Sequence, residues 1–157
     1  MDTTDIKILN CLQVDSALSV SEVAKKVGLS TSPCWNRIQR LEQSGIIRGR
    51  VALLNAESLN LRVTAFVSIR TNQHSTEWFE KFSKSISSFP EVVEFYRMSG
   101  DVDYLLRVVV PDIASYDDFY KRLIEHVDLT DVSSSFAMEE IKYTTTLPLE
   151  YVVTSKS

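Results

Sequence analysis

The sequence contains few of the residues on which metal sites and many catalytic centres depend. Among its 157 residues are two cysteines, two histidines and four glycines. Cys11 and Cys34 form no CxxC pair and have no nearby histidine pair, so they complete no metal site. We interpret both as small core residues, with a redox or ligand role for Cys34 as the alternative. No cofactor is expected.

The glycines and histidines also argue against an enzyme. The four glycines form no phosphate-cradling loop, and no GxSxG motif is present. His74 and His126 lie far apart in the sequence, each near an expected helix end, where an exposed or capping histidine is the usual explanation. The sequence therefore predicts a protein without enzymatic activity.

Long hydrophobic runs are absent as well. The apolar segment 104–110 is interrupted by Arg107 and followed by Pro111, so no stretch reaches the length of a membrane-spanning helix. The acidic segment 1–5 lacks the layout of a signal peptide, which predicts a cytoplasmic protein that does not bind membranes. A hydrophobic content of 44% is sufficient for a core in one domain or two small ones.

Positive charge is scarce overall but concentrated at one end of the chain. The formal net charge is −4, yet residues 1–50 carry +2 and the remaining residues carry −6. A basic N-terminal part on an acidic body is typical of a protein that binds phosphate groups at one end only.

Three helical patterns are present within the first 45 residues. Asp2 and Asp5 lie at capping positions of the first helix, Ser19 caps the second, and Ser32 followed by Pro33 is expected to begin the third. Apolar residues recur at helical spacing in each pattern. These features predict a helix-turn-helix arrangement.

A short hairpin is expected directly after the third helix. Gly45 ends that helix, and residues 46–54 form an apolar segment that turns at Gly49. Such a hairpin is the wing of a winged helix-turn-helix, so we predict a DNA-binding domain over residues 1–54.

After a linker at residues 55–62, the spacing of the apolar residues changes. Apolar and polar residues alternate as in strands, and two helical patterns begin near Ser75 and near Ser115 with Asp118. The expected order β-α-β-β-α-β is that of a ferredoxin-like domain over residues 63–157, so the fold class is α+β. The strands are expected at residues 63–69, 92–98, 104–110 and 132 to about 146.

The third helix carries residue types that read DNA. If Cys34, Ile38 and Leu41 turn inward, the opposite face presents amides, which pair with adenine, and a guanidinium, which pairs with guanine. Free N–H groups at the helix start can bind a phosphate, and Trp35 packs on the second helix or contacts a sugar. The residues expected to contact DNA are Ser30, Thr31, Ser32, Trp35, Asn36, Arg37, Gln39, Arg40, Gln43, Arg48 and Arg50.

The alternative is that this polar face is simply solvated, as on most surface helices. The succession of a short helix, a glycine turn, a capped helix with basic flanks and a hairpin within fifty residues favours DNA binding.

Several segments carry a family resemblance, namely residues 29–37, 40–42, 45–47, 100–104 and 142–149. Through these segments the chain resembles the Lrp/AsnC (feast/famine) transcriptional regulators, and the resemblance extends over essentially the whole chain. Segments 33–35, 74–78 and 133–139 are similar especially to the cysteine-responsive branch of that family.

The resemblance implies a homodimer formed through the C-terminal sheets, often assembled into octamers or hexadecamers, with a free amino acid bound between dimers. The matching positions are the turn at residues 99–104 and the segment 130–135. An aspartate can pair with an α-ammonium, and serine hydroxyls or backbone N–H groups can bind a carboxylate. The implied effector-binding residues are Ser99, Gly100, Asp101, Asp103, Tyr104, Asp131, Ser133, Ser134 and Ser135.

Taken without the resemblance, the same residues have simpler interpretations. Gly100 with Asp101 suits an ordinary hairpin turn, and residues 133–135 suit a polar edge strand. With the resemblance, we predict a sequence-specific regulator of amino-acid metabolism that responds to cysteine or to a leucine- or methionine-like amino acid. The alternative is a stand-alone amino-acid sensor or assembly scaffold without operator-specific DNA binding, against which the first fifty residues argue.

Overall fold

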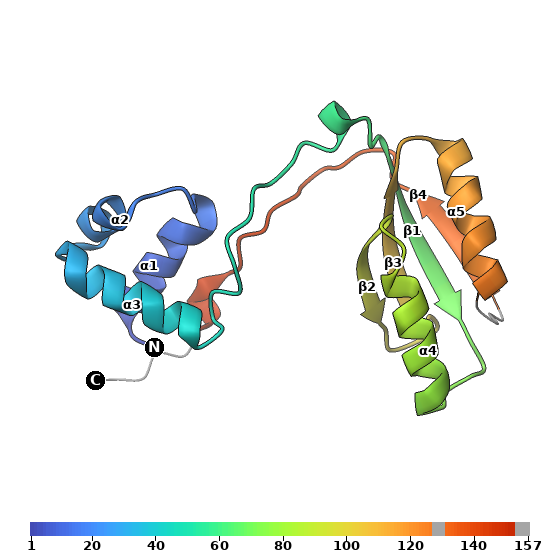
Figure 1. Cartoon of the computed structure of the whole chain (residues 1–157), viewed down its shortest axis with the longest axis horizontal. Coiled ribbons are helices and arrows are strands. Elements are labelled where there is room, and N and C mark those ends of the chain that lie inside the picture. Colours follow the sequence, from blue (N-terminus) through green and yellow to red (C-terminus); the bar gives the residue numbers. More distant parts are fainter. Residues whose placement is uncertain (127–130, 153–157) are drawn as a thin grey trace. The chain divides into compact units, whose positions relative to one another are not determined.

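The computed structural model describes residues 1–126 and 131–152 and divides the chain into two compact units (Figure 1). One unit contains residues 1–53 together with the C-terminal segment that begins at Lys142, and the other contains residues 54–141. No helix in the described residues is long and apolar enough to span a membrane.

Three helices build the first unit: α1 (Thr3–Val14), α2 (Val20–Val27) and α3 (Thr31–Gln43). Asp2 and Ser19 each close a capping box at the start of α1 and α2, as the sequence predicts. The apolar faces of the helices meet in one core, formed by Ile8, Leu9, Leu12, Val23, Ala24, Cys34, Ile38 and Leu41.

The start of α3 differs from the prediction. The helix begins at Thr31 after the N-cap residue Ser30, so Ser32 and Pro33 are its second and third residues. Proline fits here because the N–H groups of a first helical turn have no acceptor within the helix. The prediction that Ser32 is the N-cap residue is therefore wrong by two residues.

The hairpin predicted over residues 46–54 is not formed. Among the described residues, strand pairing is confined to the second unit, and residues 48–55 have no regular secondary structure. Gly49 lacks the positive φ that a two-residue hairpin turn requires, unlike Gly28 and Gly45. Val51 and Leu53 border a cavity beside α1 but remain 75% and 62% exposed, so these two residues neither pair across a turn nor join the three-helix core.

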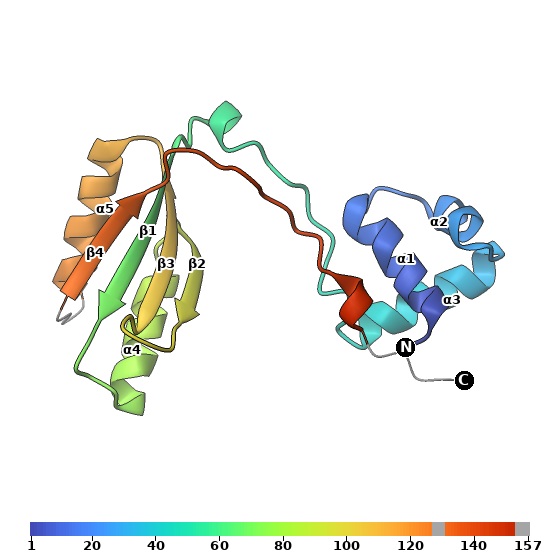
Figure 2. The same cartoon turned by 180° about the vertical axis from the view of Figure 1, so that it is seen from behind.

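The second unit has the predicted order β-α-β-β-α-β. Its four strands form one sheet in the order β2-β3-β1-β4, and all neighbouring strands are antiparallel (Figure 2). The elements are β1 (Val63–Arg70), α4 (Thr76–Ser87), β2 (Val92–Arg97), β3 (Tyr104–Val110), α5 (Ile113–His126) and β4 (Asp131–Phe136).

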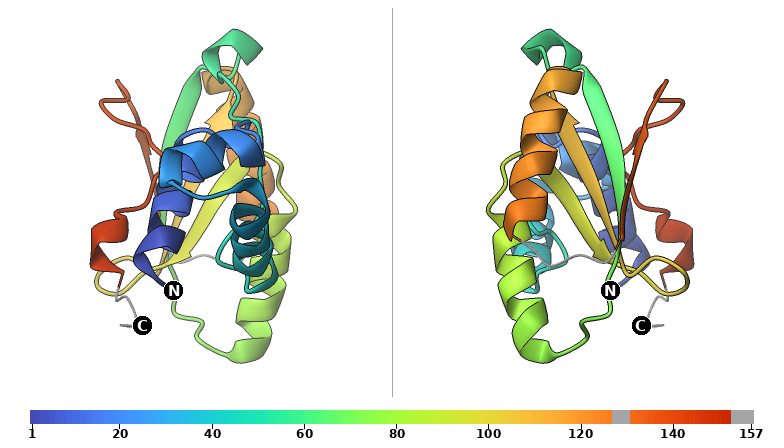
Figure 3. Two further views of the ribbon diagram at one scale, coloured as in Figure 1. Left: turned by 90° about the vertical axis from the view of Figure 1, so that its left-hand side faces the viewer. Right: turned by 90° about the vertical axis from the view of Figure 1, so that its right-hand side faces the viewer.

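Both helices of this unit cover the same face of the sheet (Figure 3). The covered face contributes alternate residues of β1 and β3 to a core with Phe82, Ile86, Phe119 and Leu123 of the helices. On the other face, Phe66 pairs in register with Arg107 and remains 39% exposed. That face therefore carries apolar surface that the two helices do not cover.

Two elements of this unit end or begin elsewhere than expected. The last strand was expected to continue to about residue 146, but β4 ends at Phe136, because it has by then reached Ala65 near the start of β1. Helix α5 begins at Ile113 instead of near Ser115, with the Asp112 carboxylate accepting a hydrogen bond from the Ser115 N–H. Thr130, which the sequence placed in the effector segment, lies outside the described residues.

The C-terminal segment, assigned by sequence to the second domain, returns to the first unit. The Gln13 side chain accepts a hydrogen bond from the Leu147 N–H at 2.9 Å and donates one to the Leu147 carbonyl at 3.2 Å. Residues Leu149–Tyr151 form a short 3-10 turn, and Leu149 packs against the three-helix core.

Candidate functional site

The outer face of α3 presents most of the residues predicted to contact DNA. Ser30, Thr31, Ser32, Trp35, Asn36, Arg40 and Gln43 are exposed, whereas Arg37 and Gln39 are half-buried. Cys34, Ile38 and Leu41 point into the core as predicted. The Gln39 amide donates a hydrogen bond to the Glu42 carboxylate at 3.0 Å. Gln39 can therefore read a base only if this hydrogen bond breaks and the amide turns outward.

Arg48 and Arg50 follow α3 on the irregular segment that replaces the expected wing. Both are exposed, and Arg50 forms a 3.0 Å ion pair with Glu42 of α3. Ion pairs between exposed side chains contribute little stability, so a phosphate can displace Glu42 at small cost. Both arginines therefore remain available for backbone contacts.

Arg37 and Arg40 instead form ion pairs with the start of α1. The Arg37 Nη1 atom lies 2.6 Å from Asp2 Oδ2 and 2.8 Å from Asp5 Oδ1. The Arg40 Nη2 atom lies 2.8 Å from Asp5 Oδ2. Asp5 was predicted only as a capping residue. Its spacing from Ile8, Leu9 and Leu12 places it on the apolar face of α1, and an acidic residue on such a face is the signal that could have revealed a buried charge pair.

The oppositely charged side chains of this cluster stabilise one another's charged forms. Burial acts to raise the pKa of Asp5, but the Asp2 N–H and the Arg37 guanidinium act against it, and the pKa is lowered overall. The Asp5 N–H and then Arg37 lower the pKa of Asp2, and hydrogen bonds to both carboxylates raise the pKa of Arg37. The cluster is thus fully ionised at neutral pH.

Acid is expected to destabilise the first unit through these carboxylates. The pKa values of both carboxyls are lower in the folded state than in the unfolded state. Their contribution to the free energy of unfolding is therefore fully present above the unfolded pKa of about 3.9, and it is lost as the pH falls through the lower folded values. Asp2→Asn should therefore lower stability at pH 7 more than at pH 3, as measured by hydrogen exchange of α1 and α3 amides in urea. Asp101→Asn, in the other unit, is the control. An equal loss at both pH values would contradict the titration mechanism.

Cys34 has the environment of a core residue. It is fully buried, and this burial raises the pKa of its thiol, so the nucleophilic thiolate is scarce at neutral pH. In the part of the chain that the structure describes, no group of three or more metal-ligating side chains gathers. The surroundings of Cys34 therefore agree with its interpretation as a small core residue.

The implied effector residues divide between one end of the sheet and its interior. The turn at residues 99–103 precedes β3, and Asp131 begins β4, so both lie at the end of the sheet where β1 finishes with Arg70. The Asp131 Oδ2 atom lies 3.9 Å from Arg70 Nη1. Ser99, Gly100 and Asp101 are exposed there.

Two of the implied effector residues point into the core. The Tyr104 ring packs among Trp78, Phe82 and Phe95, and the Ser134 hydroxyl is hydrogen-bonded to the Tyr116 hydroxyl. Ser133 and Ser135 alternate with Ser134 and are exposed on the other face of the sheet. The side chains of Tyr104 and Ser134 are thus poorly placed to contact an effector directly, because their strand parity directs them toward the helices.

Asp103 links the turn to the end of β1. Its Oδ2 atom accepts a hydrogen bond from the N–H of buried Thr71 at 2.8 Å, and its own N–H donates to the Ile69 carbonyl at 3.0 Å. The carboxylate therefore stabilises the turn. Its second oxygen, Oδ1, remains the acceptor with which an ammonium group could pair.

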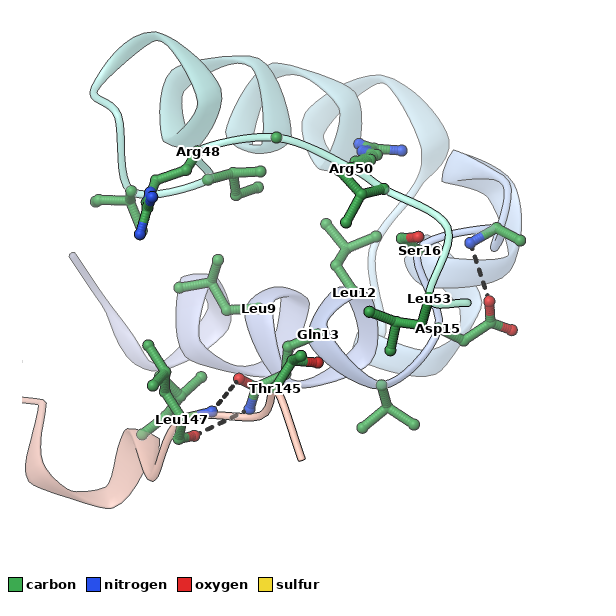
Figure 4. Close-up of a pocket in the computed structure, with 17 residues that line it drawn as sticks. Leu9, Leu12, Gln13, Asp15, Ser16, Arg48, Arg50, Leu53, Thr145 and Leu147 are labelled. Atoms are coloured by element: carbon green, nitrogen blue, oxygen red, sulfur yellow. Dashed lines mark hydrogen bonds between the residues drawn. The ribbon is translucent and has the colours of Figure 1, made fainter. Parts of the chain in front are cut away.

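A cavity of about 510 Å³ lies within the first unit (Figure 4). Leu9 and Leu12 of α1 form one side, the segment with Arg48 and Arg50 runs over it, and Leu147 borders it from the C-terminal segment. This cavity could not be predicted from the sequence, because its walls come from segments almost a hundred residues apart.

Comparison with known proteins relates both units to regulators of transcription. A model of the Lrp/AsnC ligand binding domain matches residues 64–147, and a model of winged helix-turn-helix DNA-binding domains matches residues 1–48. The class of the N-terminal domain is therefore as predicted, although its wing hairpin is not formed.

Individual relatives span nearly the whole chain. The DNA-binding transcriptional activator DecR of Escherichia coli K12 is 52% identical over 96% of this chain and 99% of its own length. The crystal structure of an AsnC family transcriptional regulator from Agrobacterium tumefaciens is 66% identical, with a TM-score of 0.95 over 98% of this chain and all of that one. A transcriptional regulator of Neisseria meningitidis, crystallised in complex with L-Met, is 38% identical, with a TM-score of 0.92 over 98% and 99% of the two chains.

Proposed function

This chain belongs to the Lrp/AsnC family of DNA-binding transcriptional regulators, and we propose that it recognises specific operators through α3 and controls genes of amino-acid metabolism in response to a free amino acid. The observation that carries the proposal is the exposed polar face of α3 on a small three-helix unit. Asn36, Arg40 and Gln43 read base edges in the major groove, and the free N–H groups at the start of α3 bind a phosphate.

A gel-shift assay with random genomic fragments tests DNA binding directly. The proposed regulator retards a subset of fragments at physiological salt, whereas a stand-alone sensor or assembly scaffold retards none. Uniform retardation of all fragments would support DNA binding but contradict operator specificity.

The three exposed arginines of the DNA-binding unit, Arg40, Arg48 and Arg50, are expected to differ in what they contribute to binding. Arg40→Ala should weaken operator binding and relax base preference by about 1–3 kcal/mol, because a guanidinium that pairs with guanine discriminates between bases. Arg48→Ala and Arg50→Ala should weaken binding to all DNA alike and reduce the salt dependence. Competition binding against shuffled duplexes at several salt concentrations measures both effects. Unchanged base preference in Arg40→Ala would count against base reading by Arg40.

The effector site is proposed at the end of the sheet that holds Asp103, Asp131 and the turn at residues 99–101. Its anions pair with the α-ammonium, and backbone N–H groups or the Ser133 hydroxyl bind the carboxylate. Ser135 lies further along β4, opposite Phe66, and is therefore not part of the site proposed at this end of the sheet. Cysteine and leucine- or methionine-like amino acids are the proposed ligands, in keeping with the resemblance to the cysteine-responsive branch and with the L-Met complex of the Neisseria relative. Calorimetric titration with the twenty amino acids identifies the preferred effector.

We further propose that the regulator is a cytoplasmic homo-oligomer, at least dimeric, that binds its effector between dimers. The support is the sheet face that α4 and α5 leave uncovered, since a four-stranded sheet with one helical layer needs cover on its second face. Native mass measurement determines the number of subunits.

A further inference from the structure

The Asp5 carboxylate is saturated with hydrogen bonds although it lies at the edge of the DNA-binding unit. Its side chain is 1% exposed. Oδ1 accepts from Arg37 Nη1 at 2.8 Å and from Arg40 Nη2 at 2.9 Å. Oδ2 accepts from Arg40 Nη2 at 2.8 Å and from the Asp2 N–H at 3.0 Å. One buried charge thus joins the first turn of α1 to two arginines of α3.

The two arginines are held in different ways. The Arg37 side chain is 29% exposed, and its Nη1 atom bridges Asp2 and Asp5, so Arg37 anchors the cluster. Arg40 remains 61% exposed, and its hydrogen bonds within the described parts of the chain involve Nη2 alone. Because the side chain is largely exposed, the other N–H groups of its guanidinium are available to a ligand.

We propose that Asp5 is a positioning residue for DNA recognition, which fixes the Arg40 guanidinium through Nη2 and so directs its remaining N–H groups at the DNA. The inference rests on the proposed function of α3. A guanidinium is planar and its donors form a rigid fork, so fixing one nitrogen also sets the direction of the others. An arginine held in this way loses less conformational entropy when it binds a base or phosphate.

Arg40 is not expected to leave Asp5 when DNA binds. Withdrawing it would leave a buried carboxylate with fewer partners, which is unfavourable, whereas the free donors can bind DNA without disturbing the pair. DNA must therefore fit an arginine whose position is already set, and this requirement favours particular sequences over general phosphate binding.

A positioning role of Asp5 and simple electrostatics predict opposite effects of Asp5→Asn on DNA binding. Removing a negative charge from the DNA-binding unit should strengthen binding to all DNA if charge alone matters. If Asp5 positions Arg40, binding to preferred sequences should weaken despite the added positive charge. Asp15→Asn is the matched control, because it makes the same charge change at an exposed site at the other end of α1.

The experiment uses the full chain and two duplexes: one enriched from a random-sequence pool by the wild-type protein, and a shuffled duplex of the same composition. Asp5→Asn should lose about tenfold in affinity for the enriched duplex, the order expected for one misplaced base contact, and bind the shuffled duplex at least as tightly as wild type. Asp15→Asn should lose affinity for neither. Thermal melting reports whether each variant is folded.

Arg40→Lys keeps the inference testable if Asp5→Asn does not fold. Lysine retains the charge but offers a single ammonium in place of the fork, so preference for the enriched duplex should fall while the salt dependence stays unchanged. Unchanged preference in Arg40→Lys, or tighter binding of both duplexes by folded Asp5→Asn, would overturn the positioning role. Failure of the wild-type protein to enrich any duplex would instead overturn the proposed function, and this inference with it.

Discussion

Phe66→Asp is expected to dissociate the protein into monomers and to lower its affinity for operator DNA by about 10²–10⁴-fold, the usual gain from linking two binding modules. Phe66 lies on β1, one of the two central strands, on the sheet face opposite α4 and α5, and is 39% exposed. An aspartate there would be buried in an interface between two sheets, and its cross-strand neighbour Arg107 is already paired with Glu94 at 2.7 Å. Two separate helix-turn-helix units would then have to bind their half-sites independently.

Light scattering of the full-length variant measures the mass, and titration of an enriched duplex measures the affinity. Ile124→Asp is the matched control, because Ile124 is a 46% exposed apolar residue on α5, which packs on the opposite face of the same sheet. The control should keep the wild-type mass and affinity. A Phe66→Asp protein that stays oligomeric would place the interface on another surface, since the substitution itself leaves the covered core untouched.

The elements that the sequence predicts most accurately are those with signals at both ends. Strand β3 spans residues 104–110 as expected, because a turn precedes it, Pro111 follows it, and its residues alternate between buried and half-buried. Helix α4 begins after Ser75, whose side chain caps it as predicted. In both cases the deciding interactions are local, so a single segment of sequence contains them.

The sequence-based predictions fail where the local structure depends on contacts between residues distant in the sequence. Asp5 pairs with Arg37 and Arg40, more than thirty residues away, and a capping pattern cannot reveal that. The segment after α3 borders a cavity together with Leu147, so its apolar residues resemble those of a hairpin without pairing as one. The inward direction of Ser134 could have been inferred, because it shares strand parity with half-buried Val132.

Asp103→Asn is expected to abolish the response to the amino-acid effector while leaving the fold intact. The Asp103 carboxylate has two separable roles in this proposal: one oxygen accepts the Thr71 N–H, and the charge pairs with the α-ammonium. Asparagine keeps an oxygen acceptor for Thr71 but loses the charge. A hydrogen bond to a charged group contributes about 1.5–3 kcal/mol, so effector affinity should fall roughly tenfold to a hundredfold.

Comparison with Asp103→Ala separates the two roles, because alanine removes both the charge and the acceptor for the Thr71 N–H. If Asp103 only stabilises the turn, alanine lowers the melting temperature, asparagine does not, and neither changes effector affinity. If Asp103 binds the ammonium, both variants lose affinity, and asparagine does so with a near-native melt. Calorimetric titration of cysteine, leucine and methionine, with thermal melting of the same samples, measures both quantities. Glu80→Gln, at an exposed position of α4 outside the proposed site, controls for a general loss of negative charge. Wild-type affinities in both Asp103 variants would move the ammonium partner to Asp101 or Asp131, or the effector site to another surface.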